Sequence, residues 1–203
     1  GYVGNPYPDV EHKISDDGEI LVKSPGSMKG YFKMPEESER AFTEDGFLNT
    51  GDLGSIDEMG RLKITGRAKE LFKTSKGKYV APAPIENLLS NSPLVEACYV
   101  TGIGYHQPHG VVVLSEDARK AVSEGDRRPL ANSLTKLLEE VNSALPPFEQ
   151  LAFLAIAKDG WSAENGFLTP TLKIKRQVLD AVYSPLADKW YEMQQPVVWQ
   201  ATS

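Results

Sequence analysis

Residues 49–86 read NTGDLGSIDEMGRLKITGRAKELFKTSKGKYVAPAPIE, and the hydrophobic pattern changes within this stretch. Its first half alternates short apolar and polar runs, as in Arg61–Thr65, with glycine turns between them, which predicts antiparallel strands. Its second half predicts a hairpin around Lys76-Gly77 and then a helix in PAPIENLLSNS. We therefore expect two structural blocks that join near Arg67–Glu70.

The residues before this stretch continue the β pattern. Alternating runs lie at Glu11–Ile14 and Glu19–Lys23, and the Asp17-Gly18 pair between them indicates a hairpin, because tight turns require positive φ angles. A short helix is expected in PEESERAF, where Pro35 suits the first helical position. Residues 1–68 are thus predicted to form an antiparallel β subdomain.

The residues after the stretch alternate buried strands, expected in LVEACYVTGIG, VVVLS and QLAFLAIA, with helices. The strongest helix signal is RPLANSLTKLLEEVNSAL, and a second helix is expected in IKRQVLDAVY with Ile174, Val178 and Val182 on its apolar stripe. The fold class is therefore α+β, with a mixed sheet flanked by helices in residues 69–203. The tail YEMQQPVVWQATS is expected to be irregular, with Trp190 and Trp199 docking back.

Composition limits the classes of function. The net charge of −6 and the pI near 5.2 argue against a nucleic-acid-binding protein, although Lys173, Lys175 and Arg176 form a local basic patch. The single cysteine, Cys98, has no partner for a disulfide or a zinc site, and its apolar surroundings predict a core residue. No apolar run approaches the roughly 18 residues of a membrane span. The chain begins without a methionine in mid-pattern, so we expect it to be a piece of a longer protein.

The first polar cluster with chemical potential is NTGDLG, residues 49–54. A carboxylate beside glycine in a tight turn, here Asp52, can accept hydrogen bonds from a diol such as ribose. The alternative is a turn aspartate that bonds only to its own backbone.

Two further clusters are basic. Cationic side chains surround two glycines in ITGRAKELFKTSKGKYV, which suits a phosphate or a diol, but a solvated basic hairpin has the same pattern. In NGFLTPTLKIKR, Lys173 lies at the mouth of a helix, where an ammonium can meet a phosphate and a carboxylate together; surface lysines are the alternative. His106 and His109 have metal-like spacing but no third ligand, so no metal site is predicted.

The order of these clusters is more specific than any one of them. GEILVKSPGSMKGYFKMPEESERAF, DGFLNTGDLGSIDEMGRLKITGRAKELFKTSKGKYVAPAPIE, LPPFEQL and NGFLTPTLKIKR together resemble the later core motifs of the adenylate-forming superfamily, across nearly the whole chain. KYVAPAPIE and LTPTLKIKR resemble the long-chain fatty acyl-CoA synthetases most. The chain departs from many members at Thr171-Leu172-Lys173, where they have serine-glycine-lysine, and at Phe47, where they have tryptophan.

The resemblance implies a two-step reaction: a carboxylate attacks the α-phosphorus of ATP, and the thiol of coenzyme A then displaces AMP. It implies that Asp52 and Arg67 bind the ribose hydroxyls and that Lys173 bridges the substrate carboxylate and the α-phosphate. It places a domain hinge at Lys69 and makes residues 69–203 a lid domain. Lys76, Gly77 and Lys78 would meet coenzyme A.

The resemblance also implies what lies outside this chain. The phosphate-binding loop, the Mg²⁺ ligands and most of the acyl tunnel are expected in a preceding N-terminal domain, so the fragment alone should be inactive and residues 1–68 should expose apolar surface. The expected substrates are a fatty acid, ATP and coenzyme A, in a cytoplasmic enzyme that associates peripherally with membranes. An acyl carrier protein as the acceptor, or a non-catalytic lid-like interaction module, remains the alternative.

Overall fold

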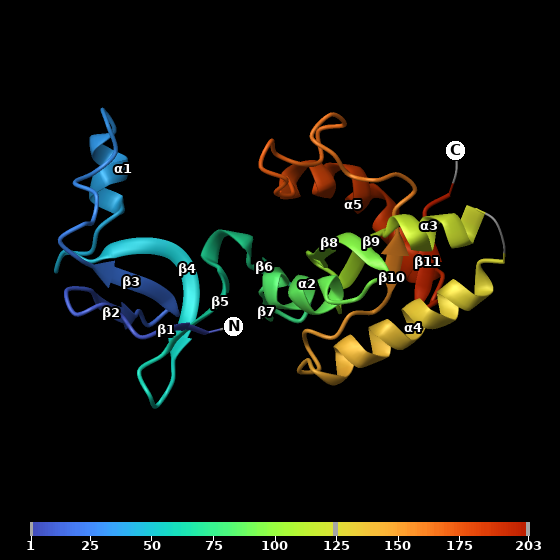
Figure 1. The fold of residues 1–203 in the computed structure, drawn as a ribbon, viewed down its shortest axis with the longest axis horizontal. Coiled ribbons are helices and arrows are strands. Elements are labelled where there is room, and N and C mark those ends of the chain that lie inside the picture. The colour runs from blue at the N-terminus through green and yellow to red at the C-terminus, as the bar shows by residue number, and fades with distance from the viewer. Residues whose placement is uncertain (1, 124–125, 202–203) are drawn as a thin grey trace. The chain divides into compact units, whose positions relative to one another are not determined.

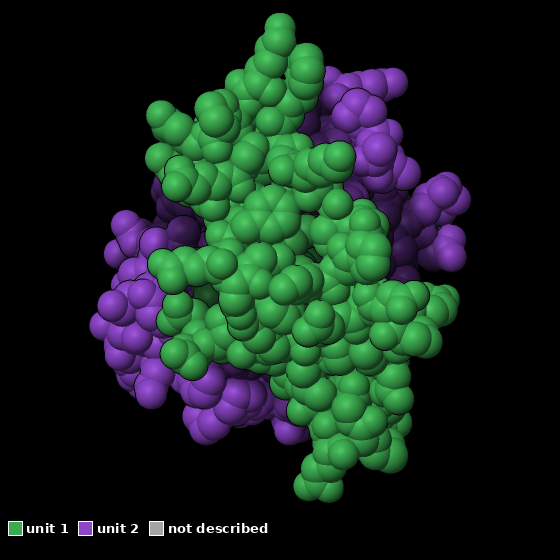
Figure 2. Space-filling view, turned by 90° about the vertical axis from the view of Figure 1, so that its left-hand side faces the viewer, with its two compact units in different colours: residues 1–71 green, residues 72–203 purple. Residues whose placement is uncertain are grey.

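The computed structural model describes residues 2–123 and 126–201. It divides the chain into two compact units, residues 1–71 and residues 72–203, which Figure 2 colours green and purple. The division follows Leu71, directly after the short 3-10 helix η1 (Ala68–Glu70).

The first unit is an antiparallel sheet, as the alternating pattern predicts. Its strands are β1 (Tyr2–Gly4), β2 (Glu11–Ile14), β3 (Glu19–Lys23), β4 (Leu48–Ile56) and β5 (Leu62–Arg67), in the spatial order β1-β5-β4-β3-β2. The hairpin at Asp17-Gly18 is confirmed, and Gly18 has a φ of +83° there. Helix α1 (Pro35–Arg40) begins at the proline that the sequence indicated.

Very little of the first unit is buried. Its buried apolar side chains, among the described residues, are Ile20, Leu21 and Phe47. Large apolar side chains are exposed instead, and Tyr7 and Phe32 keep more than four fifths of their surface accessible. The expectation of exposed apolar surface is confirmed, and the small core explains it: this sheet does not cover its own hydrophobic side chains.

The second unit contains a mixed sheet and a hairpin. The sheet has the order β11-β10-β9-β8; β8 (Val95–Thr101) and β9 (His109–Leu114) are antiparallel, while β9, β10 (Leu154–Ile156) and β11 (Val197–Trp199) are parallel. The hairpin joins β6 (Phe72–Lys73) to β7 (Tyr79–Val80) around Lys76-Gly77, as predicted. The helices are α2 (Pro82–Ser90), α3 (Glu116–Ser123), α4 (Arg128–Ser143) and α5 (Arg176–Glu192). The α+β class is therefore confirmed.

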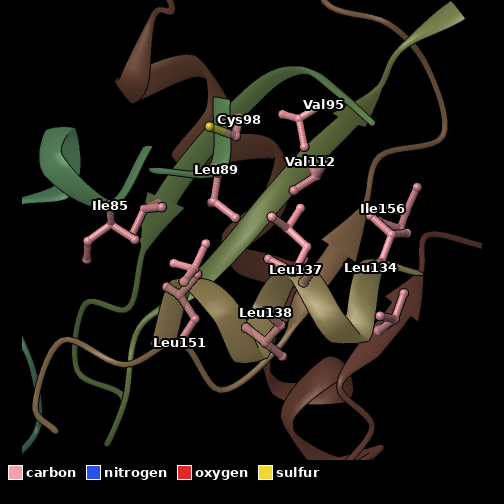
Figure 3. Close-up of a cluster of buried hydrophobic side chains, with 14 of the residues drawn as sticks. Ile85, Leu89, Val95, Cys98, Val112, Leu134, Leu137, Leu138, Leu151 and Ile156 are labelled. Carbon is pink, nitrogen blue, oxygen red and sulfur yellow. The ribbon is translucent and has the colours of Figure 1, made fainter. Parts of the chain in front are cut away.

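Helices cover both faces of the mixed sheet. Alternate residues of a strand point to opposite faces, so Val112 of β9 packs with α2 and α4 while its neighbour Val111 packs with α5. Figure 3 shows the first of these cores, to which Leu134, Leu137 and Leu138 of α4 belong. None of the helices in the described ranges has both the length and the hydropathy for crossing a bilayer.

Two local predictions were wrong, one predicted strand is shorter than expected, and one helix was missed. The tail is not irregular: α5 continues to Glu192, Trp190 is buried inside it, and residues 197–199 form β11. The apolar stripe of α5 is not Ile174, Val178 and Val182. Its buried face is Leu179, Tyr183, Ala187 and Trp190. The strand expected in QLAFLAIA is only Leu154–Ile156, and α3 was not predicted.

Candidate functional site

Asp52 and Arg67 are the two predicted ribose-binding residues, and both lie in the first unit. Asp52 lies in β4 and is the direct cross-strand partner of Arg67 at the end of β5. The Arg67 Nε atom is 2.9 Å from the Asp52 Oδ1 atom, and about a quarter of the Asp52 side chain remains accessible. The two charged groups therefore form one partly exposed polar pair on the sheet.

The expectation that Asp52 lies in a tight turn was wrong. Residues 48–56 continue as one strand because glycines absorb its irregular geometry: Gly51 has a φ of +74°, and the register with β5 shifts between Leu53 and Gly54. A Cβ at Gly54 would lie 2.7 Å from the Lys63 carbonyl oxygen. Glycine is thus required here for the close approach of two strands.

The pair has unused bonding capacity that suits a diol. A carboxylate accepts hydrogen bonds on two oxygens, and a guanidinium carries five N–H donors. The Arg67–Asp52 contact engages one oxygen of the carboxylate and the Nε donor of the guanidinium. A vicinal diol both donates and accepts, so it can bond to both residues at once.

Lys69 lies exposed in η1, just before the division between the units. The backbone on either side of η1 is extended, with ψ of 133° at Arg67 and 132° at Leu71. Lys69 therefore lies in a three-residue helical turn between two extended segments. A change in a few backbone dihedral angles there would reorient the chain between the two units.

Lys76, Gly77 and Lys78 lie together at the exposed tip of the β6–β7 hairpin. Gly77 has a φ of +77°, and its N–H donates to the Thr74 carbonyl oxygen at 2.9 Å, which closes the turn. The Ser75 N–H donates to the Tyr105 carbonyl oxygen at 2.9 Å. This hydrogen bond attaches the hairpin tip to the loop between β8 and β9.

Lys173 lies in a tight turn before α5, three residues upstream of the helix start. Thr169 closes this turn: its N–H donates to the Lys173 carbonyl oxygen at 2.7 Å, and its Oγ1 accepts from the Lys173 N–H at 3.0 Å. Leu172 has a φ of +60° and is largely exposed. The backbone of Lys173 is thus fixed on both sides, while its exposed ammonium makes no ion pair within the described residues.

A buried ion pair that the sequence reasoning missed holds the start of α5. Arg176 donates to both carboxylate oxygens of Glu86 on α2, at 2.8 and 2.6 Å, and the Val100 N–H donates to the same carboxylate at 2.8 Å. Arg176 had been assigned to a local basic patch with Lys173 and Lys175. That interpretation was wrong, because four fifths of its side chain is buried.

The remaining candidates are structural. Cys98 is a buried core residue, as expected, and burial raises the pKa of its thiol to about 11. His109 is not in a loop with His106; it begins β9, where burial lowers the pKa of its imidazole to about 4. Its Nδ1 atom lies 3.1 Å from the Tyr191 hydroxyl. No cluster of three or more potential metal ligands occurs among residues 2–123 and 126–201.

Comparison with known proteins identifies the family of this chain. Residues 70–195 match the family model described as the AMP-binding enzyme C-terminal domain. Over 95% of its length the chain is 35% identical to long-chain-fatty-acid–CoA ligase 6 from Homo sapiens.

The chain belongs to the AMP-binding enzyme family. It spans about a third of the length of the curated relatives it matches, since it covers 31% of the human ligase.

Solved structures agree with this family. The chain superimposes with a TM-score of 0.80 on the adenylation domain of the carboxylate reductase from Mycobacterium chelonae, at 25% identity, with 95% of this chain and 34% of that one covered. It also matches the corresponding domain from Segniliparus rugosus, solved with AMP and a co-purified carboxylic acid. That match has a TM-score of 0.75 at 26% identity and covers 93% and 32% of the two chains.

Proposed function

We propose that this chain is the C-terminal part of an ATP-dependent long-chain fatty acid–CoA ligase, carrying the ribose-binding pair and the lysine of adenylation. The observation that carries the proposal is the contact between Asp52 and Arg67 on adjacent strands, an exposed acceptor–donor pair suited to a diol. The fatty acid is inferred from the 35% identity to a long-chain ligase over 95% of the chain.

In the first half-reaction the fatty acid carboxylate attacks the α-phosphorus of ATP, and pyrophosphate leaves. Asp52 accepts hydrogen bonds from the ribose hydroxyls while Arg67 donates to their oxygens, which fixes the nucleoside. Lys173 places its ammonium against the α-phosphoryl oxygens and the attacking carboxylate, where negative charge accumulates. Its backbone is already fixed by Thr169, so little reorganisation is needed.

In the second half-reaction the thiol of coenzyme A attacks the acyl carbonyl carbon, and AMP leaves. A rotation at Lys69 withdraws Lys173 and brings the hairpin tip to the thiol-bearing arm. The positive φ of Gly77 and its lack of a side chain allow the backbone to approach the ligand closely. Lys76 and Lys78 are exposed on the same tip and can meet a phosphate.

The reaction needs the preceding domain, because ATP phosphates and the acid must be held together for the first step. We propose that the magnesium ligands also lie in that preceding domain. We therefore propose that residues 1–203 by themselves neither adenylate a fatty acid nor form a thioester.

The test is Asp52→Asn in the full-length parent, with the KM for ATP and the rate of acyl-AMP formation from palmitate measured. Losing a charged acceptor for the ribose should raise the KM for ATP by about tenfold or more, since hydrogen bonds to charged groups contribute about 1.5–3 kcal/mol. Asp57→Asn is the matched control, because Asp57 pairs with Arg61 in the same unit. If both substitutions raise the KM for ATP equally, or if neither raises it, the assignment of Asp52 to the ribose is contradicted.

The acceptor is tested separately. Wild-type parent loaded with acyl-AMP is offered either coenzyme A or an acyl carrier protein with its phosphopantetheine arm. Thioester formation with coenzyme A alone supports a ligase. Transfer to the carrier alone indicates a fatty acyl-AMP ligase, and failure to form acyl-AMP at all indicates a non-catalytic module.

A further inference from the structure

The second unit contains a hollow of about 390 Å³ at the carboxyl ends of its three parallel strands. Leu114, Ile156 and Trp199, the last residues of β9, β10 and β11, line it. Helix α3 lies beside it and contributes Arg119 and Val122 to the lining. We call this hollow the strand-end pocket. Its volume lies in the range of small-molecule sites, about 300–1,000 Å³, and the carboxyl ends of parallel strands are a common position for them.

Among residues 2–123 and 126–201, two of the cations that line the strand-end pocket form no ion pair. The guanidinium carbon of Arg127 lies 5.2 Å from the ring centroid of Trp199, and Arg127 forms no ion pair within the described residues. Lys158 likewise has no ion pair there; its backbone N–H donates to the Gln200 side chain at 2.9 Å. Both charged groups are therefore available to a ligand.

The third cation, Arg119, is already positioned. Its Nη2 atom is 2.8 Å from a carboxylate oxygen of Glu96, and its Nη1 atom donates to the Leu114 carbonyl oxygen at 2.8 Å. The acidic residue in the lining is Asp159. A net positive lining is notable because the whole chain carries a charge of −6.

Apart from these charged residues and Gln200, the lining is mainly apolar, and it includes Val122, Ile156 and the Trp199 ring. A ligand for this pocket must therefore join an anionic head to an apolar body. A phosphate monoester carries about 1.5–2 negative charges at neutral pH, which matches the two unpaired cations better than a single carboxylate does. The planar guanidinium of Arg127 can donate two parallel hydrogen bonds to such a group.

We propose that the strand-end pocket binds a small phosphate monoester with an apolar or aromatic body, through Arg127 and Lys158, with the body against Trp199. Asp52, Arg67, Lys173 and the residues of the hairpin tip do not line this pocket. The inference therefore does not depend on the proposed ligase reaction, and it can be tested without activity.

The experiment uses the 203-residue chain labelled with ¹⁵N and follows its three tryptophan indole signals during titration with phenyl phosphate at low ionic strength. Trp161 and Trp190 are buried in the other core of the unit, so they serve as internal references. Trp199→Phe identifies the third signal. We expect only the Trp199 signal to move, with saturation at a Kd on the order of 1 mM, a reasonable value for so small a ligand.

Inorganic phosphate and benzyl alcohol separate the contributions of head and body. Each should bind at least about fivefold more weakly than phenyl phosphate, because each offers only half of the recognised chemistry. Equal binding of inorganic phosphate would overturn the claim that the apolar body is recognised. No movement of the Trp199 signal at about 20 mM phenyl phosphate would overturn the pocket itself.

Arg127→Gln and Arg128→Gln form the matched pair of variants. Both side chains are exposed, and Arg128 does not line the pocket but pairs with Asp126. Arg127→Gln should weaken binding about tenfold, whereas Arg128→Gln should change it less than about twofold. Unchanged Trp161 and Trp190 signals show that each variant is folded. Equal effects of the two substitutions would show nonspecific attraction to basic surface and would contradict the proposal.

Discussion

Removing the carboxylate of Glu86 should strongly destabilise the second unit. The side chains of Glu86 and Arg176 are only 13% and 20% exposed, and Glu86 accepts two hydrogen bonds from Arg176 and one from the Val100 N–H. Breaking one side of a buried ion pair costs about 3–5 kcal/mol. Because the pair keeps some exposure, we expect Glu86→Ala to lower the unfolding free energy by about 3 kcal/mol, the lower end of that range.

The assay is urea unfolding of the 203-residue chain, followed by the fluorescence of the buried Trp161 and Trp190. Glu139→Ala is the matched control, since Glu139 is an exposed glutamate on α4, and it should shift the unfolding free energy by less than about 0.5 kcal/mol. The double variant Glu86→Leu/Arg176→Met should recover much of the loss, because it leaves no unpaired charge. A loss below about 1 kcal/mol for Glu86→Ala would refute the reasoning.

Burial of His109 makes stability depend on pH: its folded pKa of about 4 lies below the ordinary value of 6.5, so only the unfolded state gains a proton as the pH falls toward 4. Lowering the pH from 8 to 5.5 should therefore reduce the unfolding free energy of the wild type by about 1.4 kcal/mol. Urea unfolding should show the same reduction in His106→Gln but not in His109→Gln. A reduction that persists in His109→Gln would contradict the assignment to His109. Leu172→Gly should raise the unfolding free energy by about 1 kcal/mol, because Leu172 is exposed at a φ of +60°. Thr171→Gly is the control and should not raise the unfolding free energy. Equal effects of the two substitutions would contradict the claim that the backbone at Leu172 is strained. Gly77→Val in the full-length parent should slow thioester formation at least about tenfold while leaving acyl-AMP formation within about twofold, because Gly77 has a φ of +77°; slowing of both steps would contradict the role of the hairpin.

The sequence predicted best those features that follow from local periodicity and turn chemistry. The hairpins at Asp17-Gly18 and Lys76-Gly77 both formed, because each glycine supplies a positive φ at the turn. The long helix α4 formed because its leucines repeat at the helical period, and those leucines are buried.

Features that depend on distant parts of the chain were missed. Gly51 and Gly54 resemble turn residues, yet both lie inside β4. Glycine is favoured at position 51 by a φ of +74° and at position 54 by close packing against β3 and β5. Glu86 and Arg176 are 90 residues apart, so no periodic pattern could pair them. In α5 the stripe was misassigned partly because the expected helix stopped at Tyr183, so Ala187 and Trp190 were not counted on its apolar face.

The most direct test of the proposed function is Lys173→Ala in the full-length parent, with Lys175→Ala as the control from the same segment. Acyl-AMP formation from ATP and palmitate is measured first, and thioester formation from supplied acyl-AMP is measured separately. The account predicts that Lys173→Ala slows the first step by about 10²–10³ while the second survives, since one preorganised donor to the developing charge is lost. Lys175→Ala should leave both steps within about threefold of wild type. Normal adenylation by Lys173→Ala would contradict the central claim.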